Sequence, residues 1–315
     1  MSSADNTPLD SEPLPIIHQH PLAFLIGLEG VALLKAFAGE FDRQFTEDRL
    51  AGIRALLDAA ETLAGGVDVA PLSSQDGYDG WAQTYDEPGN GLFPLEEPLV
   101  HELLDSLPMG VAVDAACGTG RHAAYLAARG HTVLGYDTSP RMLQVAREKV
   151  PAASFEEADL RSLPVADAGC DAVICTLALA HVSDLGAAFA EFARVLRPGG
   201  HLVISDTRGH FVGSRLYPLI KWGLDGRFGY VPTWHHPASA YLRAALPHGF
   251  RVRACHEPLR DGPMVKPQAV PEPAPPADPQ APPNVWSLHL RAPDAANATY
   301  RDHPALIIWH FQLDE

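Results

Sequence analysis

Several residue types and patterns are scarce in this chain, and each scarcity removes a class of protein. The 315 residues include four cysteines (Cys117, Cys170, Cys175 and Cys255), and no two of them form a C-x-x-C pair. This gives no disulfide framework and fits a reduced cytoplasm, where we expect the protein to reside. Basic residues are also few, with 23 Lys and Arg against 39 Asp and Glu and a net charge of −16. That charge argues against a nucleic-acid partner, because phosphate binding needs clustered Lys and Arg.

Long apolar runs are missing as well. The most apolar stretch, Pro21–Phe37, is interrupted by Glu29 and Lys35. It is also shorter than the roughly 20 apolar residues that a membrane-spanning helix needs. The start of the chain, Ser2–Glu12, is polar and acidic and lacks the basic n-region of a signal peptide. We therefore expect no membrane partner.

The most informative stretch that is present is Val111–Ala123, which reads VAVDAACGTGRHA. An apolar strand runs into an acid, then into a Gly-x-Gly turn that opens a helical pattern, so backbone amides and a helix N-terminus can approach a ligand closely. Gly118, Gly120 and Ala123 also satisfy the dinucleotide fingerprint G-x-G-x-x-A. Asp114 favours a different ligand, because a carboxylate at the strand end repels a pyrophosphate and attracts an ammonium or sulfonium group. S-adenosylmethionine carries both cations.

The segments that follow repeat the alternation of strand and helix. Residues 131–137 read as a second strand ending in Asp137, roughly 20 residues past the glycine turn, where a carboxylate reaches ribose hydroxyls. Thr138, Ser139 and Pro140 then open a helix. Four further elements are predicted in order: a strand over 155–160 containing Asp159, a strand over 170–176, a helix closed by residues 196–200 (LRPGG), and a strand over 201–206.

In this order and spacing the chain resembles the class I S-adenosylmethionine-dependent methyltransferases, specifically the small-molecule branch of ubiquinone and menaquinone methylases. The resemblance covers about residues 78–210. It implies an α/β fold with a Rossmann-like seven-stranded sheet of six parallel strands and one antiparallel strand. Phe250–Leu259 would be the sixth strand, and Ala305–Leu313 would insert antiparallel between the fifth and the sixth.

The resemblance also assigns cofactor contacts, with S-adenosylmethionine as the donor and S-adenosylhomocysteine as the product. It places Asp114, Gly118 and Gly120 at the methionine end of the donor and Asp137 at its ribose. Asp159 with Leu160 would bind the adenine, against which Met142 would pack. The remaining contacts that it implies in the same strand-end loops are Ala116, Thr138 and Thr176.

A tyrosine-rich segment lies just ahead of the first strand of this domain. In related methylases such a segment closes over the cofactor. Tyr78, Trp81 and Tyr85 occur at i, i+3 and i+7, so a helix can present all three to one side. Aromatic faces suit a sulfonium, because the ring quadrupole attracts a cation. The alternative is an amphipathic helix that buries these rings in ordinary core.

The catalytic group is less well defined by the sequence. The fourth strand is followed by TLALAHV, without the Asn/Asp-Pro-Pro-Tyr pattern of base-amino methylases and without an acid that could begin a magnesium site. We therefore expect no metal. His181 and His210 follow the fourth and fifth strands, at the edge where open α/β sheets bind ligands. Either could deprotonate an acceptor hydroxyl, or His181 could be a packing residue beside the cofactor.

The domain organisation follows from these elements. We expect an extended or disordered terminus over 1–20, a helical extension over 21–70, and a methyltransferase domain over 71–315. Within that domain the aromatic and apolar segment 211–247 predicts a substrate lid and a hydrophobic or aromatic acceptor. A proline-rich insertion over 260–284 comes next, and a helix from Val285 to Tyr300 follows it.

The helical extension has three open interpretations. Apolar residues recur at helical spacing over Pro21–Phe37 and Asp42–Ala64, with Thr46 as a candidate N-cap of the second helix. These helices could form a homodimer interface, cap the substrate site, or pack as core on their own sheet.

Three functions remain to be separated. The first is a bacterial-style, metal-independent methyltransferase that acts on a small molecule by in-line displacement. The second is an S-adenosylmethionine-binding protein of the same fold that regulates a partner without methylating anything. The third, an NAD-dependent oxidoreductase, is disfavoured by Asp114 and by the early Asp159.

Overall fold

The computed structural model describes residues 13–63, 65–87, 90–208, 215–266 and 281–315. They form two compact units. One comprises residues 13–14, 71–258 and 305–315, and the other comprises 15–70 and 259–304. The second unit thus groups the N-terminal helices with the segment before the last strand, which the sequence analysis placed in the methyltransferase domain. Most of the proline-rich insertion, residues 267–280, lies outside the described residues.

The first unit is built on a seven-stranded sheet in the order β10-β11-β7-β6-β3-β4-β5. Strands β3 to β7 pair in parallel, and β11 pairs antiparallel with both β7 and β10. This confirms the predicted fold, including the last strand between the fifth and the sixth. The strands are β3 (Val111–Ala115), β4 (Thr132–Asp137), β5 (Ser154–Glu157), β6 (Cys170–Thr176), β7 (Leu196–Thr207), β10 (Phe250–His256) and β11 (Leu306–Leu313).

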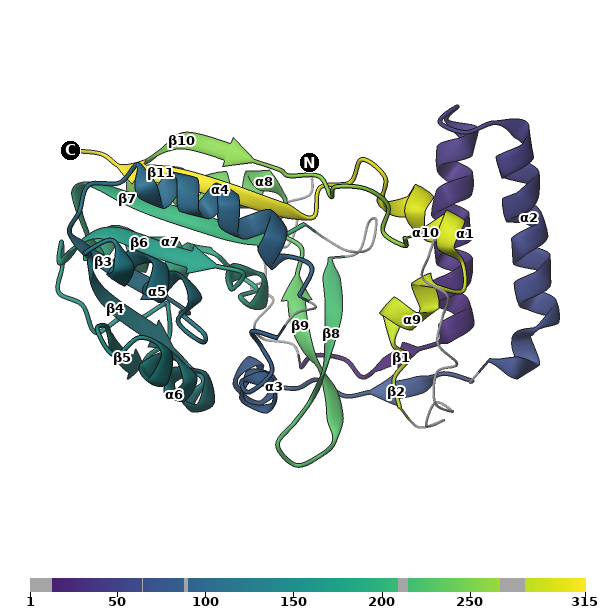
Figure 1. Ribbon diagram of the computed structural model, residues 1–315, viewed down its shortest axis with the longest axis horizontal. Helices are drawn as coiled ribbons and strands as arrows, with labels where there is room; N and C mark the ends of the chain where they lie inside the picture. Colours follow the sequence, from purple (N-terminus) through teal and green to yellow (C-terminus); the bar gives the residue numbers. More distant parts are fainter. Residues whose placement is uncertain (1–12, 64, 88–89, 209–214, 267–280) are drawn as a thin grey trace, which may run out of the picture. The chain divides into compact units, whose positions relative to one another are not determined.

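Helices cover both faces of this sheet, which explains the continuous apolar runs of its strands. On β6, Val173 and Cys175 belong to the core beneath α7 and α8, whereas Ala172 and Ile174 belong to the core beneath α4 and α5. Figure 1 shows α4 and α5 in front of the sheet. The helices of this unit are α3 (Ser74–Trp81), α4 (Phe93–Asp105), α5 (Arg121–Ala128), α6 (Pro140–Lys149), α7 (Gly186–Val195) and α8 (Ala238–Ala245), with short 3₁₀ turns η3 (Leu179–His181) and η4 (Leu246–His248).

The register aligns the carboxyl ends of the parallel strands at one edge. Ala115 pairs with Tyr136, Asp137 with Glu157, and Thr176 with Ser205. The loops that follow β3, β4, β5 and β6 therefore meet at this edge, where open α/β sheets bind their ligands.

A hairpin occupies much of the predicted lid. Its strands β8 (Leu216–Trp222) and β9 (Phe228–Trp234) pair antiparallel over their whole length. Helix α3 approaches this hairpin closely, because a Cβ at Gly77 would lie 2.4 Å from Val231 Cγ2 and one at Gly80 would lie 2.2 Å from the Trp222 carbonyl oxygen. Only glycine at both positions allows α3 to lie against the hairpin.

The second unit contains the predicted N-terminal helices, α1 (Pro21–Phe37) and α2 (Arg43–Asp58). Its core joins Leu25, Leu28 and Ala32 of α1 to Leu288 and Ala295 from the C-terminal part of the chain. No helix in the described ranges is long and apolar enough to cross a membrane. The unit also contains β1 (Ile17–Gln19), β2 (Val67–Val69), η2 (Ala60–Thr62), α9 (Val285–His289) and α10 (Pro293–Tyr300).

Several predicted boundaries are wrong, among them the end of the sixth strand, which is His256 in β10 instead of Leu259. The N-cap of α2 is Asp42, whose carboxylate accepts a hydrogen bond from the Phe45 backbone N–H at 2.9 Å, and not Thr46. The helix expected over 285–300 is two helices, and the second begins at Pro293, which lacks the N–H that a continuous helix needs. Helix α7 ends at Val195, so residues 196–200 begin β7, and β5 ends at Glu157 instead of residue 160.

Candidate active site

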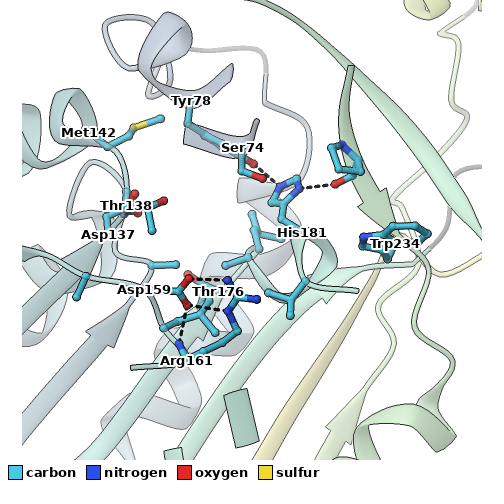
Figure 2. Close-up of a pocket in the computed structure, with 18 of the residues that line it drawn as sticks. Ser74, Tyr78, Asp137, Thr138, Met142, Asp159, Arg161, Thr176, His181 and Trp234 are labelled. Carbon is cyan, nitrogen blue, oxygen red and sulfur yellow. Dashed lines mark hydrogen bonds and ion pairs between the residues drawn. The ribbon is translucent and has the colours of Figure 1, made fainter. Parts of the chain in front are cut away.

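A pocket of about 410 Å³ opens at the carboxyl ends of the parallel strands. This volume lies within the range of small-molecule sites. Figure 2 shows Asp137, Thr138 and Met142 on one side of the pocket, Trp234 on the opposite side, and His181 between them. The lining residues that the sequence analysis named are Tyr78, Tyr85, Ala116, Gly118, Asp137, Thr138, Met142, Asp159, Leu160, Thr176 and His181.

The glycine turn after β3 takes the backbone shape that its sequence predicts. Ala116, Gly118 and Gly120 have φ values of 59°, 54° and 76°, in the left-handed region that favours glycine. Gly118 lines the pocket, and a Cβ at this position would meet no atom within 4 Å. A ligand can therefore approach the backbone closely at Gly118. Gly120 does not line the pocket and packs against α6, where a Cβ on Gly120 would lie 3.2 Å from Ala146 Cβ.

Asp137 is fixed at the end of β4 by two backbone amides. Its Oδ2 accepts from the Gly118 N–H at 2.8 Å and its Oδ1 from the Ser139 N–H at 2.9 Å. Burial raises the pKa of this carboxyl, and these amide hydrogen bonds oppose the increase. Each carboxylate oxygen keeps a lone pair for a further donor. Asp137 is thus a preorganised acceptor for ligand hydroxyls at the pocket wall.

Asp114 is placed differently from the prediction. It is 1% exposed and does not line the pocket. Neither carboxylate oxygen has a hydrogen-bond partner among the described residues. Burial raises its pKa to about 6, against the lowering effect of the His122 and Arg121 charges. Along β3, Asp114 shares the face of Ala112, which packs toward α4 and α5. In this structure the Asp114 side chain therefore does not reach the pocket, and its contact with the methionine end of a donor is not among the contacts that the pocket lining supports.

The proposed adenine end contains an unpredicted arginine. Asp159 lines the pocket, but its carboxylate is bound by Arg161 through Nη2 at 2.7 Å and Nε at 2.9 Å. The Arg161 backbone N–H donates to the same carboxylate at 2.8 Å, and these bonds lower the pKa of Asp159. Arg161 also lines the pocket. An adenine amino group would have to share Asp159 with this guanidinium.

The three predicted aromatic residues do not all reach the pocket. Helix α3 ends at Trp81, so Tyr85 lies beyond it in the following turns. Tyr78 and Tyr85 line the pocket, whereas Trp81 packs against Tyr85 at 4.7 Å between ring centroids. Lys221 Nζ lies 3.0 Å from the Trp81 ring centroid. Trp81 therefore supports Tyr85 and binds a cation of the hairpin instead of facing the pocket.

His181 lines the pocket, and both of its ring nitrogens are engaged. Nδ1 lies 3.0 Å from the Pro232 carbonyl oxygen, and Nε2 lies 2.7 Å from the Tyr78 hydroxyl. Burial lowers the pKa of His181, and the charge of Lys221 lowers it further. Its role as a base stays a prediction. The second candidate, His210, lies outside the described residues.

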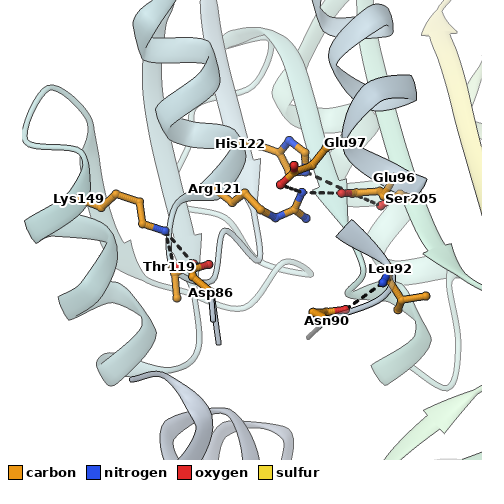
Figure 3. A network of polar contacts seen from close by, with 10 residues as sticks. All are labelled: Asp86, Asn90, Leu92, Glu96, Glu97, Thr119, Arg121, His122, Lys149 and Ser205. Atoms are coloured by element: carbon orange, nitrogen blue, oxygen red, sulfur yellow. Dashed lines mark hydrogen bonds and ion pairs between the residues drawn. The ribbon is translucent and has the colours of Figure 1, made fainter. Parts of the chain in front are cut away.

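Two carboxylates, the buried Asp79 and the exposed Asp86, fasten the Tyr78–Asp86 segment to the loops beside the pocket. Ser139 Oγ donates to Asp79 at 2.5 Å, which ties α3 to the N-terminus of α6. Thr119 Oγ1 donates to Asp86 at 2.8 Å, and Lys149 forms an ion pair with the same carboxylate. Figure 3 shows Thr119 and Asp86 side by side, with the Lys149 ammonium reaching both.

A second polar network stabilises the N-terminus of α5 (Figure 3). Glu96 accepts from Arg121 Nη1 at 2.5 Å, from Ser205 Oγ at 2.7 Å and from His122 Nε2 at 3.2 Å. Burial alone would raise the pKa of Glu96, but the His122 hydrogen bond and the nearby charges lower it to about 2. The helix that follows the glycine turn is therefore anchored at its N-terminus to α4 and β7.

Comparison with known proteins agrees with this geometry. Residues 113–204 match the family model described as a methyltransferase domain. The demethylmenaquinone methyltransferase of Thermus thermophilus is 35% identical over 163 residues, which cover 45% of this chain and 74% of that protein. This chain belongs to the class I S-adenosylmethionine-dependent methyltransferases. Its cofactor is accordingly S-adenosylmethionine, which confirms the predicted donor and removes the NAD alternative.

Other relatives match this methyltransferase over shorter stretches. Methyltransferase GfsG of Streptomyces halstedii is 39% identical over 34% of this chain and 41% of its own length. The malonyl-[acyl-carrier protein] O-methyltransferase of Yersinia pestis is 35% identical over 39% of this chain and 46% of its own length. The chain thus spans less than half the length of these relatives.

Solved structures share the fold. The [4+2]-cyclase SpnF has a TM-score of 0.52 at 18% identity, covering 79% of this chain and 98% of its own. A chain in the complex of the Haloferax volcanii Trm112 methyltransferase activator with a methyltransferase gives the same TM-score and identity, over 77% of this chain and 100% of its own. A fold that also carries a cyclase does not by itself decide the reaction of this methyltransferase.

Proposed function

We propose that this methyltransferase transfers the methyl group of S-adenosylmethionine to a small hydrophobic or aromatic molecule, by in-line displacement and without a metal. The observation that carries the proposal is one pocket with two differently built sides. Asp137 and Gly118 form a polar wall at the strand ends, and Trp234 forms an aromatic wall on the hairpin. His181 lies between the two sides, where donor and acceptor would meet.

The polar side suits the donor. Asp137 would accept hydrogen bonds from the ribose hydroxyls, Gly118 allows close backbone approach, and Met142 and Leu160 offer apolar surface for adenine. Thr138, Ala116 and Thr176 complete this wall in the proposal. When bound, S-adenosylmethionine supplies an electrophilic methyl group on a sulfonium. Residues that hold donor and acceptor in line can lower the barrier by up to about 7–11 kcal/mol.

The acceptor side is mostly apolar. It is lined by Leu177, Ala178, Val182, Pro232 and Trp234. No Lys occurs among the described residues that line the pocket. Apolar and aromatic walls with few polar groups favour apolar ligands. The names of two relatives point to demethylmenaquinone and to a malonyl group on acyl-carrier protein. The first fits an aromatic acceptor better, and the net charge of −16 disfavours nucleic acid.

We also propose that the N-terminal helices mediate contact between two copies of the chain. At the end of α1, Leu34 is 70% exposed and Phe37 is 94% exposed, which leaves large apolar side chains uncovered. Light scattering on the full chain and on the Phe37→Glu variant tests this. A dimer in the first sample and a monomer in the second supports it, and two monomers contradict it.

The test of the main proposal has two stages. Titration calorimetry should show binding of S-adenosylmethionine and no binding of NAD. The protein is then incubated with methyl-labelled S-adenosylmethionine and a panel of naphthols, naphthalenediols, aromatic amines and fatty acids, with and without EDTA. Release of S-adenosylhomocysteine with an aromatic acceptor, unchanged by EDTA, is expected. Donor binding without turnover of any acceptor would favour the non-methylating regulator.

A further inference from the structure

The hydrogen bonds of His181 determine its tautomer. The Pro232 carbonyl oxygen can only accept, so Nδ1, at 3.0 Å, carries the proton in that contact. Burial lowers the pKa of His181, so the ring is neutral near pH 7 and Nε2 has a free lone pair. The partner of Nε2 at 2.7 Å is the Tyr78 hydroxyl, which must then be the donor.

This arrangement leaves Tyr78 Oη with lone pairs and no proton to offer. Tyr78 and His181 both line the pocket, with ring centroids 5.3 Å apart in an edge-on arrangement. His181 itself has no free nitrogen for an acceptor molecule. A hydroxyl or amine in the pocket could therefore donate to Tyr78 Oη but not directly to the imidazole.

We propose that Tyr78 is the catalytic residue that receives the acceptor's proton, and that His181 acts as the base through it. The inference rests on the proposed function. As the acceptor heteroatom bonds to the methyl carbon, the carbon–sulfur bond breaks and its electron pair goes to sulfur. The acceptor's proton moves to Tyr78 Oη while the tyrosine proton moves to His181 Nε2. The positive charge that leaves the sulfonium then resides on an imidazolium whose Nδ1–H stays on the Pro232 carbonyl.

The surroundings of the pair suit this proton path. Asp137 from β4 and Asp206 from β7 act on Tyr78 electrostatically, as does Tyr85, and burial raises the pKa of the Tyr78 hydroxyl well above its usual value. A phenol that does not ionise on its own can pass a proton on without becoming a stable phenolate. Lys221 on β8 is the cation that acts on His181. Burial lowers the pKa of Lys221 to about 7, so its charge weakens near neutral pH.

The proposal also narrows the acceptor class. A hydrogen-bond acceptor at Tyr78 Oη selects a nucleophile that carries a proton, such as a hydroxyl or an amine. A nucleophile that is already ionised gains little from the pair. The effect of removing the tyrosine hydroxyl should therefore depend on the protonation state of the acceptor.

The first test needs no acceptor. ¹⁵N NMR of the histidine-labelled protein should show His181 protonated at Nδ1 and unprotonated at Nε2. In Tyr78→Phe the pKa of His181 should rise, because the hydrogen bond that stabilises its neutral form is lost. An Nε2–H tautomer, or the same His181 titration in both proteins, would overturn the proposal.

The second test measures turnover with 2-naphthol, which is protonated near neutral pH, and with 4-nitrophenolate. Tyr78→Phe should lower kcat with 2-naphthol by about 10²-fold and with 4-nitrophenolate far less. The control is Tyr125→Phe, which removes an exposed hydroxyl that donates to Asp105 and should leave both rates unchanged. Equal losses with the two acceptors would overturn the relay. If the wild type methylates neither phenol, the proposed acceptor class fails, and the NMR result still decides whether the pair exists.

Discussion

The two sides of the pocket are built by different means. The donor side consists of short turns at the ends of parallel strands, and Asp137 is fixed there by two backbone amides. The acceptor side consists of the β8–β9 hairpin and the η3 turn, and its fixed polar group is a side-chain pair, Tyr78 with His181. The donor side therefore has a geometry that the backbone enforces, whereas the acceptor side depends on side chains that can change with the substrate.

The largest expected effect concerns Glu96, which holds the N-terminus of α5 on the donor side of the pocket. Glu96→Gln breaks a buried ion pair and should lower the free energy of unfolding by about 3 kcal/mol at pH 7. Because the folded-state pKa of Glu96 is lowered to about 2, its contribution is present above pH 4.5 and is lost as the pH falls toward 2. Denaturant unfolding at several pH values measures the difference, which should shrink in acid.

The control for this variant is Glu97→Gln. Glu97 lies 3.2 Å from the same Arg121 guanidinium but is half-exposed. An ion pair of this kind is worth about 1 kcal/mol or less. A loss as large as that of Glu96→Gln would show that burial is not the source of the difference.

The second effect is on donor affinity. Asp137→Ala removes charged hydrogen-bond acceptors worth about 1.5–3 kcal/mol, so binding of S-adenosylmethionine should weaken by about 10- to 100-fold. Asp105→Ala removes an exposed carboxylate that is bonded to Arg129 and serves as the control. Calorimetry on both variants gives the comparison, and an unchanged affinity for Asp137→Ala would remove the ribose assignment.

The third effect distinguishes acceptor binding from donor binding on the two sides of the pocket. Trp234→Ala should raise the KM for an aromatic acceptor by about tenfold, because it removes an aromatic contact of about 1–2 kcal/mol. The dissociation constant of S-adenosylmethionine should not change. If donor affinity falls as much as acceptor KM rises, the division of the pocket is wrong.

The smallest effect concerns Asp114. Asp114→Asn should change the affinity for S-adenosylmethionine by less than about threefold, because the side chain lies away from the pocket. Burial raises the pKa of Asp114 from its usual value of 3.8 to about 6. The protonated side chain therefore contributes its full stability below pH 3.8, and this contribution is lost as the pH rises through 6. The free energy of unfolding of the variant, relative to that of the wild type, should thus rise by about 1 kcal/mol between pH 5 and pH 8. A gain that does not depend on pH would contradict this assignment.

The fold was largely predictable because strands buried on both faces read as continuous apolar runs. Cys170–Thr176 is an example, with both sets of alternating side chains in cores. The hairpin was not predicted as strands, since apolar residues such as Leu219 and Ile220 suit either element. Cap positions were ambiguous for a similar reason, because Asp42 and Thr46 are both good N-cap residues.

Within the site, the sequence predicted which residues lie at strand ends better than it predicted where their side chains point. Asp114 and Asp137 have the same signature in the sequence, an acid after an apolar run. Asp114 is paired within β3 and follows the pleat toward α5, whereas Asp137 ends its strand and turns to the glycine loop. The pairing of Arg161 with Asp159 and of Tyr78 with His181 depends on side-chain placement that spacing does not encode.

The central claim is that donor and acceptor occupy opposite walls of one pocket, with His181 between them. A crystal structure of the protein with S-adenosylhomocysteine tests this most directly. The account predicts ribose hydroxyls within hydrogen-bond distance of Asp137 and a sulfur atom that faces Tyr78 and His181. A nucleoside stacked on Trp234, with Asp137 making no contact to it, would contradict the account.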